Sequence, residues 1–297
     1  MKFCLTLSFI QPALLCEIAQ TAEEYGWDAV SVSDHLVNPD EIEAKYPYNE
    51  DGGRMWNHST PWPDVWVSTA MMAAVTQKLE FLQSVYILPM RDPFHVAKAV
   101  GTLAIMSQHR VHLGIGLGWM FDEFKVVGAP FEKRGKRMDE MVEVMKKLWT
   151  GDLVEHHGAF YDFAPLSMAP GVGADVPIVV GGISDHALRR TARLGDGWAP
   201  AYLSTEDLRA GIEKIRTYQR EYGREGADLK VFTNASDFSM AEGFARLEEA
   251  GVTHTTATPW INTDGPMDYE KMIAGVPLDT ILDGIKRYSD EVIAKVK

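Results

Sequence analysis

Apolar residues follow two patterns along the chain: short, almost continuous runs, and longer stretches in which they recur at helical spacing. The short runs predict buried strands, and the periodic stretches predict amphipathic helices that cover them. The predicted strands occupy residues 2–8, 29–32, 79–87, 111–115, 177–180, 196–200, 229–233 and 252–256.

A helix is expected after each of these strands. The stretch 134–150 shows the reason, because its apolar residues recur every three or four positions and Gly151 follows as a stop. The other predicted helices occupy residues 11–26, 63–76, 93–107, 184–194, 205–222, 240–250 and 278–296.

Eight strand–helix pairs in one rhythm predict an α/β fold in which a parallel sheet closes on itself. We therefore expect a single (β/α)8 TIM barrel that spans residues 1–297 as one domain. The alternative is a doubly wound sheet, which has fewer strands and usually a glycine-rich turn after the first. Here the first strand is followed by the sequence SFIQP at 8–12, so the barrel is favoured.

Two insertions interrupt this rhythm. Residues 36–62, after the second strand, are rich in Pro, Tyr, Trp, Asn and Gly, and residues 152–176, before the fifth strand, contain the hairpin-like sequence VEHHGAFYDF. Long loops at the carboxyl ends of barrel strands commonly enclose substrates. The first insertion is therefore a candidate lid, with Trp56 and Trp62 lining an apolar substrate pocket. Tyr46 and Tyr48 are further candidates, and a packed surface loop with ordinary aromatic residues remains the alternative.

Composition narrows the possible partners. The formal charge of −13 argues against nucleic acids and anionic membranes, which both require concentrated Lys and Arg. No apolar run approaches the roughly 18 residues of a membrane span. Gln11 and Pro12 interrupt the apolar N-terminus, and the spacing of Cys4 and Cys16 matches no metal or redox motif. We expect a cytoplasmic protein that acts on a small molecule.

The second predicted strand, within AVSVSDH at 29–35, ends in two polar residues that are costly to bury, Asp34 and His35. An imidazole with a pKa of about 6.5 exchanges protons close to neutral pH, and a neighbouring carboxylate can orient the ring. The two side chains could instead cap the next turn. At the carboxyl end of a barrel strand, catalytic roles for His35 and Asp34 are favoured.

Glycines mark two other strand ends. Gly181 and Gly182 follow the fifth strand and precede a helix, an arrangement that suits a phosphate but also a plain tight turn. Gly114, Gly116 and Gly118 alternate through the end of the fourth strand. They could leave a flat floor for a planar ring, or relieve crowding at the barrel mouth.

Metal binding is not expected. The histidine pairs at 109/112 and 156/157 have no further ligands at useful spacing.

Four segments carry a resemblance to a known family. They are Ser33–His35 as SDH, LPMRDPFHVAKAVGTLAIMSQHRVHLGIGLGW at 88–119, FEKRGKRMDEMVEVMKKLW, and PIVVGGISDHALRRTARLGDGWAP ending at Pro200. By these segments the chain resembles the luciferase-like monooxygenase superfamily, and within it the branch that uses the deazaflavin coenzyme F420. The resemblance implies an oxidoreductase that transfers a hydride to or from a small, apolar organic substrate, and a homodimer.

The resemblance also implies roles for individual residues. His35 matches the acid/base histidine beside the deazaflavin, and Asp34 matches an acidic residue that contacts the ring. Ser84 and Val85 match a non-prolyl cis peptide behind the ring. The residues expected at the phosphate are Gly181, Gly182 and Ile183, and Gly116 and Trp119 are also expected at the cofactor.

One position departs from the family pattern. Trp119 stands where the sugar-phosphate dehydrogenase of this branch has a glutamate, so that activity is not transferred to this chain. Glu123 lies nearby in sequence and is a candidate replacement in the substrate pocket. Two other functions stay open: an FMN-dependent monooxygenase on the same fold, and a barrel that binds flavin without catalysis.

Overall fold

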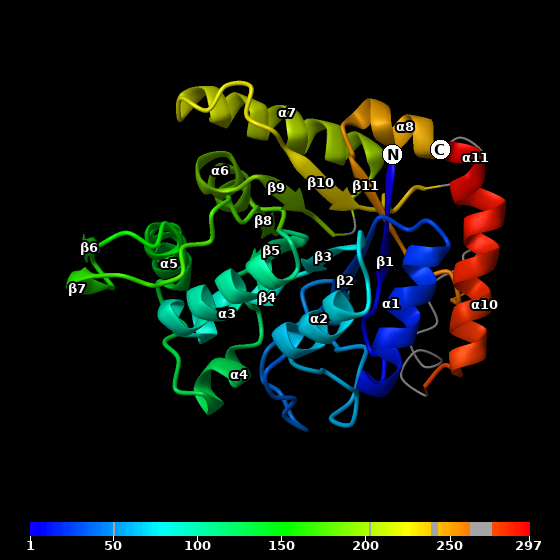
Figure 1. Cartoon of the computed structure of the whole chain (residues 1–297), viewed down its shortest axis with the longest axis horizontal. Helices are drawn as coiled ribbons and strands as arrows, with labels where there is room; N and C mark the ends of the chain where they lie inside the picture. The colour runs from blue at the N-terminus through cyan, green and yellow to red at the C-terminus, as the bar shows by residue number, and fades with distance from the viewer. Residues whose placement is uncertain (50, 202, 239–242, 262–274) are drawn as a thin grey trace.

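A closed parallel barrel surrounded by helices forms the centre of the molecule (Figure 1). The computed structural model describes residues 1–49, 51–201, 203–238, 243–261 and 275–297. The barrel strands are β1 (Lys2–Thr6), β2 (Ala29–Val32), β3 (Glu80–Gln83), β4 (Tyr86–Ile87), β5 (Val111–Gly116), β8 (Ile178–Gly181), β9 (Gly197–Ala199), β10 (Lys230–Thr233) and β11 (His254–Ala257). Strand β5 pairs with β8 on one side and with both β3 and β4 on the other, which closes the ring. The predicted (β/α)8 barrel is confirmed.

The helices lie on the outside of this ring, as the chain pattern predicts. They are α1 (Leu15–Glu24), α2 (Val65–Ala74), α3 (Pro93–Met106), α4 (Phe121–Val126), α5 (Arg134–Trp149), α6 (Asp185–Leu194), α7 (Thr205–Glu221), α8 (Gly243–Ala250), α10 (Leu278–Tyr288) and α11 (Ala294–Val296). Asp64, Asp92, Ser184 and Ser204 cap four of them by accepting backbone N–H bonds in the first turn. The predicted start at Met240 of the seventh predicted helix, which corresponds to α8, lies outside the described residues, and the short helix α4 was not predicted.

Most barrel strands are buried on both faces. The outer side chains pack against the helices, as Phe3 does against Phe244 of α8 and Tyr288 of α10. The inner side chains form a separate cluster with members from six strands: Cys4, Ala29, Leu82, Val179, Ala199 and Phe232. Burial on both sides explains why the strands read as continuous apolar runs.

The two insertions differ in structure. The second forms an antiparallel hairpin of β6 (Val154–His157) and β7 (Asp162–Leu166), as predicted. The first, residues 36–62, has no helix or strand among its described residues and lies at the same end of the barrel as α4 (Figure 1). None of the helices within the described ranges is both long and apolar enough to cross a membrane.

The predicted third strand, 79–87, is wrong in one respect, because it is not continuous. It is interrupted at Ser84–Val85, a cis peptide bond, and resumes as β4. The physical reason is local space in the neighbouring strand. A side chain at Gly114 of β5 would place its Cβ 1.6 Å from the carbonyl oxygen of Gln83, so only glycine permits the third strand to approach and bend there.

A group of titratable side chains, of which His112 and His254 are buried, lies at the amino-terminal end of the barrel. Glu80 accepts a bond from Lys2 at 2.7 Å and contacts Nε2 of His112 at 2.8 Å. His254 stacks on Phe232 with ring centroids 3.9 Å apart. Burial, together with the charge of Lys2, lowers the pKa of His254 to about 3. Burial also lowers the pKa of His112, although Glu80 opposes that shift.

This group predicts that acid destabilises the fold. A histidine whose pKa is lowered in the folded state binds its proton more tightly in the unfolded state. The folded state therefore keeps its stability above the unfolded pKa of about 6.5 and loses it as the pH falls below that value. Each such histidine should reduce the free energy of unfolding by up to about 1.4 kcal/mol per pH unit. Urea denaturation between pH 7.5 and 5.5 measures the slope.

The control for this prediction compares two histidines. His254→Phe keeps a ring against Phe232 and should flatten the slope. His95→Asn, at a fully solvated position, should leave the slope unchanged. Equal slopes for the wild type and His254→Phe would contradict the assignment.

Candidate active site

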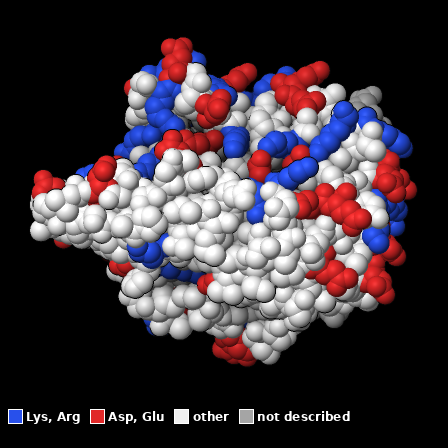
Figure 2. All heavy atoms as spheres, in the orientation of Figure 1, with Lys and Arg blue, Asp and Glu red and all other residues white. Residues whose placement is uncertain are grey.

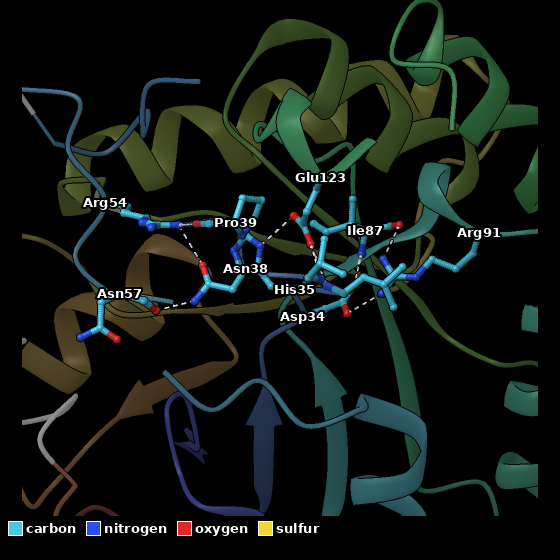
Figure 3. A network of polar contacts seen from close by, with 11 residues as sticks. Asp34, His35, Asn38, Pro39, Arg54, Asn57, Ile87, Arg91 and Glu123 are labelled. Carbon is cyan, nitrogen blue, oxygen red and sulfur yellow. Dashed lines mark hydrogen bonds and ion pairs between the residues drawn. The ribbon is translucent and has the colours of Figure 1, made fainter. Parts of the chain in front are cut away.

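Asp34 joins the end of β2 to the segment that follows the strand-three bulge. One carboxylate oxygen accepts a bond from Arg91 Nη2 at 2.7 Å, and the other accepts the backbone N–H of Ile87 at 2.9 Å (Figure 3). Burial raises the pKa of Asp34, and the Arg91 charge and the Ile87 N–H oppose that rise. Both oxygens are therefore engaged with the protein. The structure shows Asp34 as an anchor, and its contact with a cofactor ring stays a prediction.

His35 is held by a carboxylate from another part of the barrel. Its Nδ1 lies 2.8 Å from Oε2 of Glu123, whose side chain is only 2% exposed. The second oxygen of Glu123 accepts the backbone N–H groups of Leu36 at 2.7 Å and Val37 at 3.2 Å. Glu123 thus fixes both the imidazole and the start of the insertion. The structure does not place it as a wall of the substrate pocket, because its oxygens are used beneath His35.

Helix α4 is the element that brings Glu123 to this place. Its first turn also carries Asp122, which accepts the backbone N–H groups of Glu43 at 3.0 Å and Ala44 at 3.1 Å. Two successive carboxylates of α4 therefore fasten the 36–62 insertion to the barrel. In the sequence, the signal for this helix is the acidic pair Asp122 and Glu123, because acidic residues are typical of a helix N-terminus.

An aromatic cluster covers His35. Its members that touch the imidazole are Trp62, Trp56 and Trp119, with ring centroids 4.6, 5.1 and 6.3 Å away. Phe9 packs against Trp62 at 5.1 Å and was not predicted. Trp56 and Trp62 therefore both lie against His35, and their role in lining a substrate pocket stays a prediction.

The two tyrosines of the insertion lie in different environments. Tyr46 is buried and contacts Trp56 and Trp119 with centroid distances of 5.3 and 5.2 Å. Tyr48 packs against Tyr46 but is 39% exposed. Tyr46 belongs to the aromatic cluster, whereas Tyr48 lies at its edge.

The Ser84–Val85 bond is cis, as the family resemblance predicted. The bulge directs Val85 toward the glycines of two neighbouring strands. A Cβ at Gly116 would lie 2.4 Å from Val85 Cγ2, and a Cβ at Gly181 would lie 2.7 Å from Val85 Cγ1. Both glycines therefore admit Val85. For Gly114, Gly116 and Gly118 the close neighbours of each position favour relief of crowding over an open flat floor.

The turn after β8 precedes α6 as predicted. Gly182 has a φ of +106°, which favours glycine, and its carbonyl accepts the indole N–H of Trp198 at 2.8 Å. Ser184 caps α6 by accepting the N–H of Ala187, and Ile183 is 49% exposed. Val85 connects this turn to the rest of the site, because it packs against Gly181.

The fold therefore brings the predicted residues to one end of the barrel. Asp34 and His35 follow the end of β2, Val85 lies in the bulge, and Trp119 and Glu123 lie in the segment after β5. Arg91, within LPMRDP at 88–93, was not predicted as part of this site. Its pairing with Asp34 depends on how β2 and β4 are placed and has no local signal.

Comparison with known proteins adds the family context. Residues 7–281 match the family model for luciferase-like monooxygenase. An uncharacterized protein of Mycobacterium tuberculosis is 36% identical over 282 residues, which cover 94% of each chain. An F420-dependent glucose-6-phosphate dehydrogenase of Rhodococcus hoagii is 30% identical over 301 residues, covering 96% of this chain and 84% of the relative.

Solved structures share the fold over the whole chain. An F420-dependent secondary alcohol dehydrogenase in complex with an F420-acetone adduct has a TM-score of 0.73 at 17% identity, with 99% of each chain covered. A type II Baeyer-Villiger monooxygenase from Pseudomonas putida in complex with FMN has a TM-score of 0.62 at 17% identity, with 98% and 94% covered. At 17% identity, both similarities establish a shared fold only.

The Glu123 contact predicts the tautomer of His35. A carboxylate accepts, so neutral His35 should carry its proton on Nδ1 and leave Nε2 as an acceptor. In Glu123→Gln the amide oxygen can keep the Leu36 and Val37 N–H groups while its NH₂ faces the imidazole. The proton should then move to Nε2. The ¹⁵N chemical shifts of His35 in neutral imidazole form distinguish the two tautomers.

The neighbouring carboxylate provides the matched control. Asp122→Asn alters the fastening of the insertion at Glu43 and Ala44 without touching His35. It should leave the Nδ1–H tautomer in place. The same tautomer in wild type and Glu123→Gln would show that Glu123 does not determine the state of His35.

Proposed function

The chain belongs to the luciferase-like monooxygenase family, and from that premise we propose an F420-dependent oxidoreductase that transfers a hydride between the deazaflavin and a small, apolar organic substrate. The main support for this function is the contact between His35 and Glu123, which lies at the barrel mouth beneath the aromatic cluster. The 30% identical F420-dependent relative over nearly the whole chain supports the choice of coenzyme.

The residues at the mouth fit a planar cofactor with a phosphate. Val85 presents an apolar surface on the bulge, between β5 and β8. Gly182, at positive φ, directly precedes the capped N-terminus of α6, where backbone N–H groups favour an anion. Val85 would lie behind the ring, and Gly182 with Ile183 would hold the phosphate. The bound deazaflavin would supply the carbon that gives or takes the hydride.

Asp185 is an acidic residue near the proposed phosphate turn. It is the first residue of α6, where a free carboxylate would repel a phosphate. Its oxygens instead pair with Lys214 at 2.6 Å and Arg189 at 3.0 Å, and the hydroxyl of Tyr218 donates to it at 2.5 Å. These partners lower the pKa of Asp185 and offset its charge, so the turn keeps its preference for an anion.

His35 is arranged for proton transfer rather than for binding alone. Glu123 uses Nδ1, so Nε2 is the nitrogen that can accept or donate a proton toward a substrate. The indole rings of Trp56, Trp62 and Trp119 surround the imidazole and limit the access of water. In the oxidising direction the neutral ring can take the alcohol proton at this nitrogen, and in the reducing direction the protonated ring can return it to the carbonyl oxygen.

The contact between His35 and Glu123 also distinguishes the two alternative functions. An FMN-dependent monooxygenase shares the fold and activates oxygen on reduced flavin, without a need for a hydride-coupled proton at His35. A non-catalytic flavin-binding barrel would not require the buried carboxylate behind the imidazole. The His35–Glu123 pair therefore favours hydride transfer over both.

Titration of the purified protein with F420 and with FMN tests the proposal. Quenching of cofactor fluorescence should show F420 binding at least tenfold tighter than FMN, a difference of about 1.4 kcal/mol. With reduced F420 and a panel of small ketones, His35→Ala should lower turnover by about 10²–10⁴-fold and leave F420 affinity nearly unchanged.

Three other results would contradict the proposal. Tight FMN binding without an F420 response would overturn the coenzyme and favour the monooxygenase. Binding without turnover of any tested class of substrate would favour the non-catalytic barrel. Full turnover by His35→Ala would remove His35 from the mechanism.

We also propose that the chain forms a homodimer through α2 and α3. Helix α2 has no charged residue and is apolar on its exposed side, which consists of Val67, Ala70, Met71, Ala74 and Val75. Helix α3 exposes Ile105 and Met106 beside it. Figure 2 shows few charged side chains over these two helices, while Lys, Arg, Asp and Glu crowd the upper part of the same face. A helix that is apolar all round is usually buried, and a second copy would bury this one.

Light scattering at micromolar concentration measures the oligomeric state. Met71→Lys places a charge on the exposed face of α2 and should convert a dimer to a monomer. Leu153→Lys, at an exposed leucine before the hairpin, is the control and should stay dimeric. A wild-type monomer would contradict the proposed interface.

A further inference from the structure

Arg91 joins two segments of the proposed cofactor site. Its Nη2 donates to Oδ1 of Asp34 at 2.7 Å, and its Nη1 donates to the carbonyl of Ile87 at 3.1 Å (Figure 3). The backbone N–H of Ile87 in turn donates to Oδ2 of Asp34 at 2.9 Å. Guanidinium, carboxylate and peptide group therefore form a closed ring of hydrogen bonds. This ring holds the residue before His35 against the segment just after Val85.

The guanidinium of Arg91 is itself fixed in place. It lies over the ring of Tyr86, with Cζ 4.5 Å from the ring centroid, and its side chain is only 13% exposed. Trp66 of α2 packs on the same tyrosine with centroids 4.8 Å apart. A planar guanidinium that stacks on an aromatic ring and makes two directed bonds is not equivalent to a lysine ammonium. The position therefore depends on the shape of arginine as well as on its charge.

The charge of Asp34 depends on Arg91. The Asp34 side chain is 6% exposed, and burial raises its pKa, whereas the charge of Arg91 acts most strongly against that rise. A buried carboxylate that loses its cation is left uncompensated or takes up a proton. The other titratable groups around the pair are Tyr86 on β4, His35 next in the chain, Glu123 of α4 behind His35, and Asp64, whose charge acts on Tyr86.

His35 is held from two sides. Glu123 orients the imidazole through Nδ1 at 2.8 Å. Asp34 directly precedes His35 in the chain, so the ring of hydrogen bonds fixes the backbone from which the imidazole projects. The same ring fixes Ile87, two residues after Val85 of the strand-three bulge. A small misplacement of a reacting group lowers turnover more than binding.

We propose that Arg91 is a positioning residue, which pairs with Asp34 and thereby holds His35 and the strand-three bulge in their relative positions at the cofactor site. Arg91 itself transfers neither proton nor hydride. This inference rests on the proposed function and adds a residue to that same site. Because Arg91 acts through Asp34, the effect of replacing it should depend on the charge of Asp34 and should disappear when Asp34 is replaced first.

The first measurement uses the full chain without cofactor. The carboxyl ¹³C signal of Asp34, assigned with Asp34→Asn, is followed between about pH 5 and pH 9. Arg91→Gln should increase the proton affinity of Asp34 at least about tenfold, because an adjacent cation usually lowers a carboxyl pKa by about 1–3. The ring signals of His35 should shift over the same pH range. Arg91→Lys keeps the charge and should change the proton affinity less.

Turnover with reduced F420 and a small ketone supplies the second measurement. Near neutral pH, Arg91→Gln should lower kcat by about 10–100-fold with a smaller change in KM. Part of the loss should be recovered as the pH rises and Asp34 ionises, at the pKa given by the ¹³C signal. Arg91→Lys should recover part of it at every pH. In the Asp34→Asn background, Arg91→Gln should lower kcat by less than about twofold further.

Arg190 provides the matched control. It is a buried arginine of α6 that pairs with Asp139 of α5. Arg190→Gln also removes the cation of an ion pair, so it should lower the stability toward urea. It should leave the proton affinity of Asp34 and the pH dependence of kcat unchanged. A loss of stability alone therefore does not reproduce the effect expected of Arg91→Gln.

The two proposals fail separately. An unchanged proton affinity of Asp34 in Arg91→Gln, no recovery of kcat at high pH, or an equal loss of kcat with and without Asp34 would overturn the role of Arg91. If Arg91→Gln changes the Asp34 and His35 signals as expected but F420 does not bind, Arg91 still positions His35 and the coenzyme assignment is wrong.

Discussion

The buried carboxylate of Glu123 is the contact on which the mouth of the barrel depends. One oxygen orients His35, and the other holds the first two residues of the insertion by their backbone N–H groups. A buried carboxylate is stable only when such partners compensate for lost hydration. The same bonds therefore stabilise the charge, align the imidazole and determine where the aromatic residues of the insertion begin their path over the site.

A second constraint acts at the strand-three bulge. Val85 projects from the strand-three bulge into space that Gly116 and Gly181 leave open, and Asp34 fastens the end of β2 to Ile87 just beyond the bulge. Backbone geometry and side-chain packing thus support each other across three strands. In a closed barrel these strands cannot shift independently, so the bulge, the acidic anchor and the glycine turn keep a common arrangement.

Much of the fold could be predicted from local pattern. The continuous apolar runs follow from strands buried on both faces, and capping residues such as Asp92 and Ser184 mark helix starts. The break at Ser84–Val85 was expected from family resemblance alone, because the run at 79–87 contains no glycine or proline to mark a break in the strand. Helix α4 was missed because six residues are too few to show a helical period.

The sequence by itself determined the barrel, and it predicted the strand end at which His35 now lies in contact with Trp56 and Trp62. Only the tertiary structure decided their connections. Glu123 and His35 are 88 residues apart, and Asp34 and Arg91 are 57 apart, so no local spacing relates them. Closure of the sheet brings these distant strand ends together, and it changes Glu123 from an expected pocket residue into the support of His35.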